Sequence, residues 1–432
     1  MKLSRLLFAV VLMIAGSAGA WWAMAQTGSV VAAITGVPGM PAVLDPTNLY
    51  SETQAGKLSP VVKDALPRVY VPNRRSNSVS VIDPATLQVV DAFKVGRNPQ
   101  HVVPSWDLKT LWVANNAEGR TDGSLTPIDP LTGKPGPAIA VDDPYNVYWS
   151  PDGKSAIIVA EELKRLDFRD PQTMQLQYSI ATPKCGGINH ADFAIDGSFA
   201  LFTCEFDGAV TKIDLVNRKV IGTITLSPYY ARPDVVAQLT ALEKKKSELI
   251  TTQQVIVQEA PELGGAICTS RGMPQDIRVS PDGKTFFVAD MLADGVHVVD
   301  GASFKQIGFI PAGVGTHGLY PSRDGKSLYV ANRGTNKMIG RKGGKGSVSV
   351  IDFATRKVVK TWPIPGGGSP DMGNVSADGK YLWLSGRFDD EVYRISTSSG
   401  EVDKIKVGRE PHGLTVWPQP GRYSLGHTGN MR

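Results

Sequence analysis

Residues 328–332 read LYVAN and residues 348–352 read VSVID, and this pair of apolar strands closed by an aspartate decides the fold. The second strand type recurs seven times along the chain. The copies end at Asp83, Asp129, Asp167, Asp214, Asp300, Asp352 and Ser396. Successive copies are 38 to 52 residues apart, except for one interval of 86 residues. Because a four-stranded propeller blade has a period of about 40 to 50 residues, the repeat predicts seven blades.

A second set of strands supports the same number. Each begins with a proline or its equivalent and ends at a hairpin of the Ser-Pro-Asp-Gly type. These strands begin near Pro99, Pro144, Ile188, Pro274, Thr316, Pro370 and Pro411. The first unit, at 68–73, lacks an inner strand, whereas the last inner strand, around 412–417, lies near the C-terminus. We therefore predict an all-β, seven-bladed propeller of four-stranded antiparallel blades, in which the two chain ends complete one blade.

The chain divides into a leader, an extension, the propeller and a tail. Lys2 and Arg5 precede an apolar run at 6–20, and 23–25 (AMA) resembles a cleavage site, so 1–25 is expected to be a signal peptide. An uncleaved N-terminal anchor is the alternative, and no later segment could cross a membrane. A periplasmic or secreted location follows. The remaining predicted parts are an extension at 26–65, the propeller at 66–421 with an insertion at 227–271 and a helix near 233–250, and a tail at 422–432.

Composition and cysteines narrow the class of protein. Apolar residues make up 42% of the chain and charged residues 20%, which fits a globular domain. The net charge of +5 falls to +3 without the leader, since 44 basic residues then face 41 acidic ones. Nucleic acid is therefore not an expected partner.

Cys204 is predicted to lie opposite Asn189, so a Cys185–Cys204 disulfide is expected, with thiolate ligation of a metal as the alternative. Cys268 has no evident mate.

A resemblance to a known family rests on three segments. Residues 70–73 (YVPN), 111–115 (LWVAN) and 328–332 (LYVAN) are each followed by a strand of the VSVID type. These motifs resemble those of the YVTN-repeat β-propeller proteins, over roughly residues 66–421. The resemblance implies the propeller fold. It does not imply one function, because similar propellers include surface-layer proteins, lactonase-like and lyase-like enzymes and the haem-binding propeller of a nitrite reductase.

The beginnings of the inner strands should surround the mouth of the central channel. One position per blade gives His101, Asn146, His190, Asp276, Gly318, Met372 and Gly413. The preceding position gives Gln100, Tyr145, Asn189, Gln275, His317, Asp371 and His412. Alternate residues of a strand point to opposite sides, so both sets are not expected to face inward together. Four of the six histidines still map to one rim.

These residue types predict a metal site. Neutral imidazole is a common ligand for transition metals, so His101, His190, His317 and His412 could hold copper, zinc or iron, with Asp276 and Asp371 as helpers. The alternative is that the rings bond the backbones of neighbouring blades. His297 is expected to have a packing role. His427, in the tail, is expected beside the closing blade or across one face.

Three functions remain from the sequence. The leading hypothesis is an exported binding module that presents its histidine-rich channel mouth to a metal ion, a small ligand or another exported protein. The second is an enzyme, either a metal-dependent oxidoreductase or a propeller lyase or lactonase, that uses the same histidines as ligands or as acid and base. The third is a structural envelope or surface protein. The chain has no haem-attaching CxxCH, phosphate-binding Gly-rich loop, HExxH or nucleophile elbow.

Overall fold

The computed structural model describes residues 33–245, 271–427 and 429–432. Residues Ala33–Arg432 form one compact unit. The predicted signal peptide, the end of the predicted helix at 246–250 and Cys268 lie outside the described residues.

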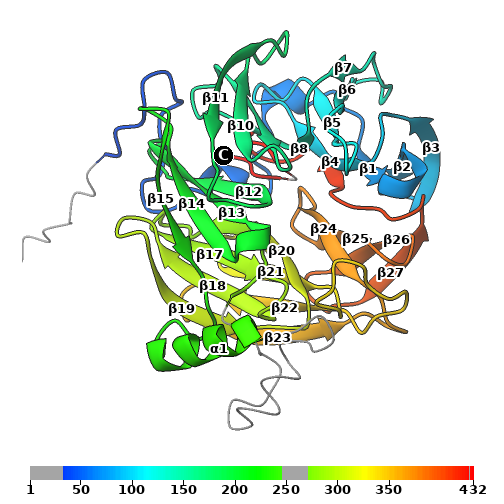
Figure 1. The fold of residues 1–432 in the computed structure, drawn as a ribbon. Coiled ribbons are helices and arrows are strands. Elements are labelled where there is room, and N and C mark those ends of the chain that lie inside the picture. The colour runs from blue at the N-terminus through cyan, green and yellow to red at the C-terminus, as the bar shows by residue number, and fades with distance from the viewer. Residues whose placement is uncertain (1–32, 246–270, 428) are drawn as a thin grey trace, which may run out of the picture. The chain divides into compact units, whose positions relative to one another are not determined.

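Seven four-stranded antiparallel sheets make up the described part of the chain (Figure 1). The first three, in sheet order, are β28(Thr415–Trp417)-β1(Arg68–Asn73)-β2(Ser78–Asp83)-β3(Gln88–Lys94), β4(Pro99–Pro104)-β5(Leu111–Asn115)-β6(Ser124–Ile128)-β7(Ile139–Ala140) and β8(Pro144–Trp149)-β9(Ala156–Ala160)-β10(Arg165–Arg169)-β11(Leu176–Ala181). The next two are β12(Ile188–Phe193)-β13(Phe199–Cys204)-β14(Ala209–Asp214)-β15(Lys219–Thr225) and β16(Pro274–Val279)-β17(Thr285–Asp290)-β18(Gly295–Asp300)-β19(Lys305–Pro311). The last two are β20(Thr316–Pro321)-β21(Ser327–Asn332)-β22(Ser347–Asp352)-β23(Lys357–Pro363) and β24(Pro370–Val375)-β25(Tyr381–Gly386)-β26(Glu391–Ser396)-β27(Val402–Lys406).

The sheets follow one another around a ring. The inner strands contact each other in the cyclic order β4, β8, β12, β16, β20, β24, β28 and back to β4. The strand from the C-terminal part, β28, pairs with β1 from Arg68↔Trp417 to Tyr70↔Thr415 and so completes the first blade. The predicted seven-bladed propeller and its closure are confirmed. We number the blades 1 to 7 in the order given above, and we call the end where the inner strands begin the top.

The inner strands depart from a regular strand at their beginning. In six of the seven blades the pairing register shifts in the first residues of the inner strand, for example between Pro99 and His101. A β-bulge places an extra residue in one strand and bends it there. As a result, Gln100 and His101 both lie at the channel, although they are successive residues of one strand.

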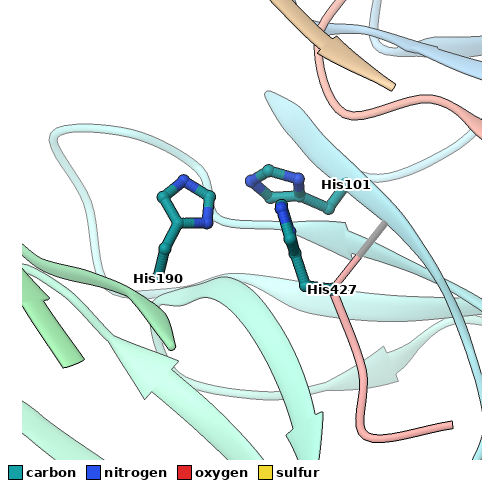
Figure 2. Close-up of side chains that lie close together, drawn as sticks. All are labelled: His101, His190 and His427. Atoms are coloured by element: carbon teal, nitrogen blue, oxygen red, sulfur yellow. The ribbon is translucent and has the colours of Figure 1, made fainter. Parts of the chain in front are cut away.

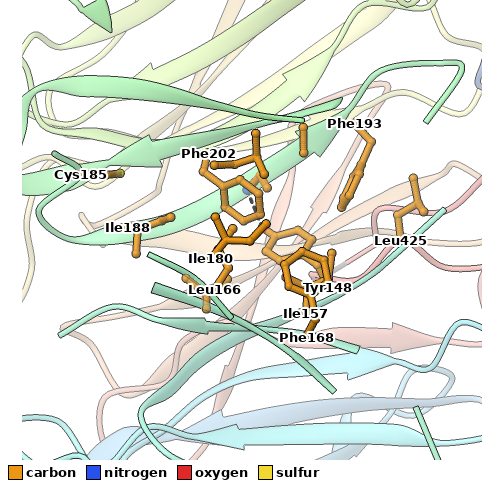
Figure 3. Packing of buried hydrophobic residues seen from close by; sticks show 14 of the residues in the cluster. Tyr148, Ile157, Leu166, Phe168, Ile180, Cys185, Ile188, Phe193, Phe202 and Leu425 are labelled. Carbon is orange, nitrogen blue, oxygen red and sulfur yellow. Dashed lines mark hydrogen bonds between the residues drawn. The ribbon is translucent and has the colours of Figure 1, made fainter. Parts of the chain in front are cut away.

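Apolar side chains between neighbouring blades form the core. In the cluster between blades 3 and 4, Tyr148 and Phe168 pack with Phe193 and Phe202, and Leu425 of the tail joins them (Figure 3). The same cluster contains a disulfide between Cys185 and Cys204, with Cα atoms 4.8 Å apart. Cys204 pairs with Ile188 and not with Asn189 as expected, because the bulge in β12 shifts the register.

Residues 37–49 and the C-terminal tail cover the bottom of the ring, where the hairpins between first and second strands lie. The N-terminal segment bonds these hairpins, as when Val37 N donates to Asp196 O and Leu49 N donates to Pro281 O. The tail enters the channel from the bottom, because Gly426 of the tail pairs with Tyr148 of the inner strand β8. Four 3-10 helices occur in the described residues: Ser51–Thr53, Pro60–Val62, Arg74–Ser76 and Glu205–Asp207.

The insertion after β15 contains a short helix, as predicted. This helix, α1(Pro233–Lys245), begins with a proline in its first turn, where a missing N–H costs no hydrogen bond. Val235 and Leu239, one turn apart, are buried. No helix in the described ranges is long and apolar enough to span a membrane.

Candidate metal centre

Three histidines from distant parts of the chain meet inside the channel. His101 comes from β4, His190 from β12 and His427 from the tail, and their rings converge (Figure 2). The ring centroids are 5.3 Å apart for His101 and His190, 5.1 Å for His101 and His427, and 4.6 Å for His190 and His427. One ring nitrogen of each lies within 4.8 Å of the other two. We call these three residues the histidine triad.

The triad is buried and poor in hydrogen bonds. All three side chains have 0% exposure, and neither ring nitrogen of His101 has a hydrogen-bond partner; Nε2 of His190 also has none. Leaving a buried donor or acceptor without a partner costs about 1 to 3 kcal/mol. Burial holds the pKa of His101 well below its usual value, and the nearby His427 lowers this pKa further. The rings are therefore neutral near pH 7, with nitrogen lone pairs available to a ligand.

Two side chains orient the triad. The Asn146 amide nitrogen lies 3.3 Å from His190 Nδ1 and 3.0 Å from His427 Nδ1, and Asn146 Oδ1 accepts from Val147 N. His427 Nε2 lies 3.4 Å from Asp276 Oδ1. A carboxylate beside a ligating imidazole is a common support at metal sites, because it fixes the orientation of the ring.

A glycine makes room for His101. A Cβ atom at Gly413 would lie 2.0 Å from His101 Nδ1, so no residue with a side chain fits at this position. The backbone of blade 1 therefore approaches the ring directly. This close approach explains why the equivalent rim position of blade 1, Gly413, lacks a side chain.

A second buried group adjoins the triad. His317 Nδ1 lies 2.9 Å from Asp371 Oδ1, and His412 Nε2 lies 3.4 Å from Asp371 Oδ2. Arg333 Nε donates to Asp371 Oδ1 at 2.7 Å. Burial alone would raise the pKa of Asp371, but Arg333 and the two histidines hold it well below its usual value. Because Arg333 already neutralises this carboxylate, His317, Asp371 and His412 are a poorer cation site than the triad.

The triad lies next to a pocket at the top of the ring. His412 and His317 line an open pocket with a volume of about 280 Å³. The ring of His412 lies 4.9 Å from that of His101 in centroid distance, and the ring of Tyr145 lies 5.4 Å from it. Below the triad, the tail occupies the channel: Trp149 N donates to Leu425 O, and Arg432 pairs with the buried Asp192. The side chains of His412 and Tyr145 thus separate the triad from the pocket.

Comparison with protein families identifies the fold family. The family described as YNCE-like β-propeller matches residues 27–184 and 272–420, which together span more than half of the chain. The chain belongs to the YNCE-like β-propeller family. The gap between the two matched ranges contains the insertion with α1.

Solved structures similar to this YNCE-like propeller have different roles. The Kuenenia stuttgartiensis hydrazine synthase has a TM-score of 0.52 and 18% identity, covering 73% of this chain and 88% of its own. The dihydro-heme d1 dehydrogenase NirN has a TM-score of 0.53 and 14% identity, and the match covers 81% of this chain and 75% of NirN. A candidate 6-phosphogluconolactonase from Bacteroides uniformis has a TM-score of 0.55 and 15% identity, and the match covers 81% of this chain and 99% of that protein. At these identities the likeness shows the fold alone, and no curated protein gives a significant match.

The structure separates the predicted site residues of this YNCE-like propeller into two groups. His101 and His190 belong to the triad, with Asp276 beside it, whereas His317 and His412 surround Asp371. His427 was missed as a ligand, because it belongs to no repeat. The only signal in the sequence was weak: His427 directly follows a glycine in the tail. His297 has the expected structural role, since Asp290 and Gln306 bond its two nitrogens.

Proposed function

We propose that this YNCE-like propeller is an exported metal-binding module, in which His101, His190 and His427 hold one transition-metal ion inside the channel. The observation that carries this proposal is the convergence of three buried imidazoles, of which His101 has no hydrogen bond at either nitrogen. A metal ion would supply the missing partner. Copper, zinc and iron are the candidates, because imidazole nitrogens suit all three.

The donor set fits such an ion with a small movement. Zinc takes histidine nitrogens at about 2.0 to 2.1 Å, which in tetrahedral geometry requires nitrogens about 3.3 Å apart. The triad nitrogens lie within 4.8 Å of one another, so the rings would close in by roughly 1 Å. The Asn146 amide would give up its contacts with the ring nitrogens that turn to the metal.

An oxidising compartment is part of the proposal. The Cys185–Cys204 disulfide and the predicted signal peptide at 1–25 both favour the periplasm or the exterior of the cell. A metal site there needs protection from loss to solvent. Burial of the triad under the pocket and above the tail provides it.

Metal content of purified variants tests the proposal. We expect about one metal equivalent per chain by inductively coupled plasma mass spectrometry, and a loss of at least tenfold in occupancy for His190→Ala, since each ligand is needed. His317→Ala is the matched control, because it removes a buried channel histidine outside the triad. Loss of metal in His317→Ala with full metal in His190→Ala would contradict the assignment, as would wild-type protein without metal after exposure to copper and zinc.

A metal-dependent enzyme is the second candidate. Three protein ligands leave a coordination position open, as catalytic zinc sites do. The pocket at the top lies next to the triad, and the side chains of His412 and Tyr145 stand between the pocket and His101. This arrangement favours the oxidoreductase alternative over a structural envelope protein, which needs no such pocket.

A further inference from the structure

The pocket at the top has walls built by one repeated position. The residue directly after each second strand lies at the rim, and six of the seven such residues line the pocket. They are Arg74, Asn116, Glu161, Glu205, Arg333 and Arg387. The arginines come from blades 6, 7 and 1, and the glutamates come from the neighbouring blades 3 and 4. The pocket is thus positive on one side and negative on the other.

The positive side is already neutralised by the protein itself. Arg74 pairs with Glu118 and Glu410, and Arg333 pairs with Asp371. Arg387 lies 3.6 Å from Asp371 and 3.5 Å from Glu410. The three arginine charges therefore have three carboxylates beside them.

The negative side has no such close ion pairs. Within 4.0 Å, neither Glu161 nor Glu205 has a lysine, arginine or histidine partner among the residues that the structure describes. More distant arginine charges do lower their pKa values, those of Arg333 and Arg387 for Glu205 and that of Arg74 for Glu161, against the larger effect of burial. Glu205 is 8% exposed and accepts a hydrogen bond from Asn189 at 3.1 Å. Burial raises the pKa of the Glu161 carboxyl, and the neighbouring Glu205 raises it further. Ionising the partly buried Glu161 together with the buried Glu205 is costly, so a cationic ligand would stabilise the ionised pair.

The side chain of Gln100, in the same pocket, has an unused hydrogen-bond acceptor. Gln100 is 2% exposed and lines the pocket, and its Oε1 has no hydrogen-bond partner. Its amide nitrogen contacts the side-chain oxygens of Asn98 and Asn116, at 3.4 and 3.3 Å, which leaves Oε1 as an unused acceptor. The aromatic ring of Tyr145 lines the pocket next to it, and a cation can bind the face of such a ring.

We propose that this pocket binds a small organic cation with a primary ammonium group, held by the carboxylates of Glu161 and Glu205 and by Oε1 of Gln100. The ammonium group supplies both the missing positive charge and N–H donors. The volume of about 280 Å³ exceeds what a bare metal ion needs, since one water occupies about 30 Å³ of liquid, and it suits a molecule of several heavy atoms. This site uses other residues than the triad, so it does not depend on the proposed metal.

Calorimetric titration of the purified full chain with n-butylammonium chloride tests the site. We expect saturable binding of butylammonium, and at least tenfold weaker binding of 1-butanol, which lacks the charge, and of tetramethylammonium, which lacks N–H donors. Glu161→Gln and Glu205→Gln should each weaken butylammonium binding about tenfold or more. Glu401→Gln is the control, because it removes an exposed glutamate of blade 7 that does not line the pocket. It should change the affinity for butylammonium less than twofold.

Three results would overturn the site. The first is equal binding of butanol and butylammonium, and the second is unchanged affinity in both glutamate variants. The third is displacement of butylammonium by equimolar zinc, which would mean that the carboxylates bind metal ions and not an organic cation. The comparison of ligands on the unaltered protein needs no variant to fold. For the variants, circular dichroism and the denaturation midpoint confirm that a loss of binding is local.

Discussion

Asp294 is a half-buried carboxylate whose pKa predicts a pH dependence of stability. Its Oδ1 accepts a hydrogen bond from Gly315 N at 2.7 Å, yet burial, together with the charge of Asp290, raises its pKa to about 6. The folded state therefore takes up a proton at a higher pH than the unfolded state does. The contribution of Asp294 makes the protein more stable as the pH falls from about 6 to 4, and it is lost as the pH rises through 6.

Asp294→Asn should remove this dependence. Asparagine tolerates the positive φ of 57° at this position and keeps a carbonyl oxygen for Gly315. We expect the difference in unfolding free energy between the variant and the natural protein to change by about 1 to 2 kcal/mol between pH 4 and pH 7, in favour of the variant at pH 7. Urea denaturation at four pH values measures it. Parallel stability curves for the two proteins would contradict the raised pKa.

At the scale of elements, the repeat predicts the strands but not their irregularities. The hairpin and strand patterns placed β4, β8, β12, β16, β20 and β24 at their first residues, because proline and turn residues mark those positions. The bulges carry no comparable mark. They bring Gln275 and Asp276 into the channel together, as they do for Gln100 and His101, so the candidate ligands were found while their division into two groups was not.

The tail is the element that sequence reasoning could place least. Its position depends on backbone hydrogen bonds, such as His427 N to Val147 O, and on the pair between Arg432 and Asp192. Backbone bonds leave no residue pattern, and the aspartate lies 240 residues away. His427 therefore enters the triad through contacts that no local motif encodes.

Gly426→Ala tests how the tail docks. Gly426 has a φ of +100°, and a Cβ atom there would lie 2.4 Å from the Tyr148 Cα atom. We expect the variant to lose about 1 to 3 kcal/mol of stability relative to Gly56→Ala, and to bind less metal, since His427 is the next residue. Gly56 is the matched control, because it also has a positive φ, but a Cβ atom there would have no neighbour within 4 Å. Equal denaturation midpoints in the two variants would show that the tail does not dock as described.

For the whole molecule, ring closure through β28 predicts how truncation acts. β28 buries Trp417 against β1, and Val416 N donates to the side chain of Asn374 in blade 7. A chain that ends after residue 410 should lose at least about 3 kcal/mol relative to one that ends after residue 421, which keeps β28 but not the tail. Guanidinium denaturation of both chains measures this difference. Similar midpoints would mean that the first blade is stable without its inner strand.

The rim position after each second strand has a consequence for how such proteins diversify. Seven equivalent sites in one framework carry arginine, asparagine, glutamate and methionine at the same backbone location. A single codon change at one of them alters the chemistry that a ligand meets while leaving every blade intact. In a related chain, the residues at these seven positions accordingly define the chemistry of the channel mouth. A change of preferred ligand should alter these positions first.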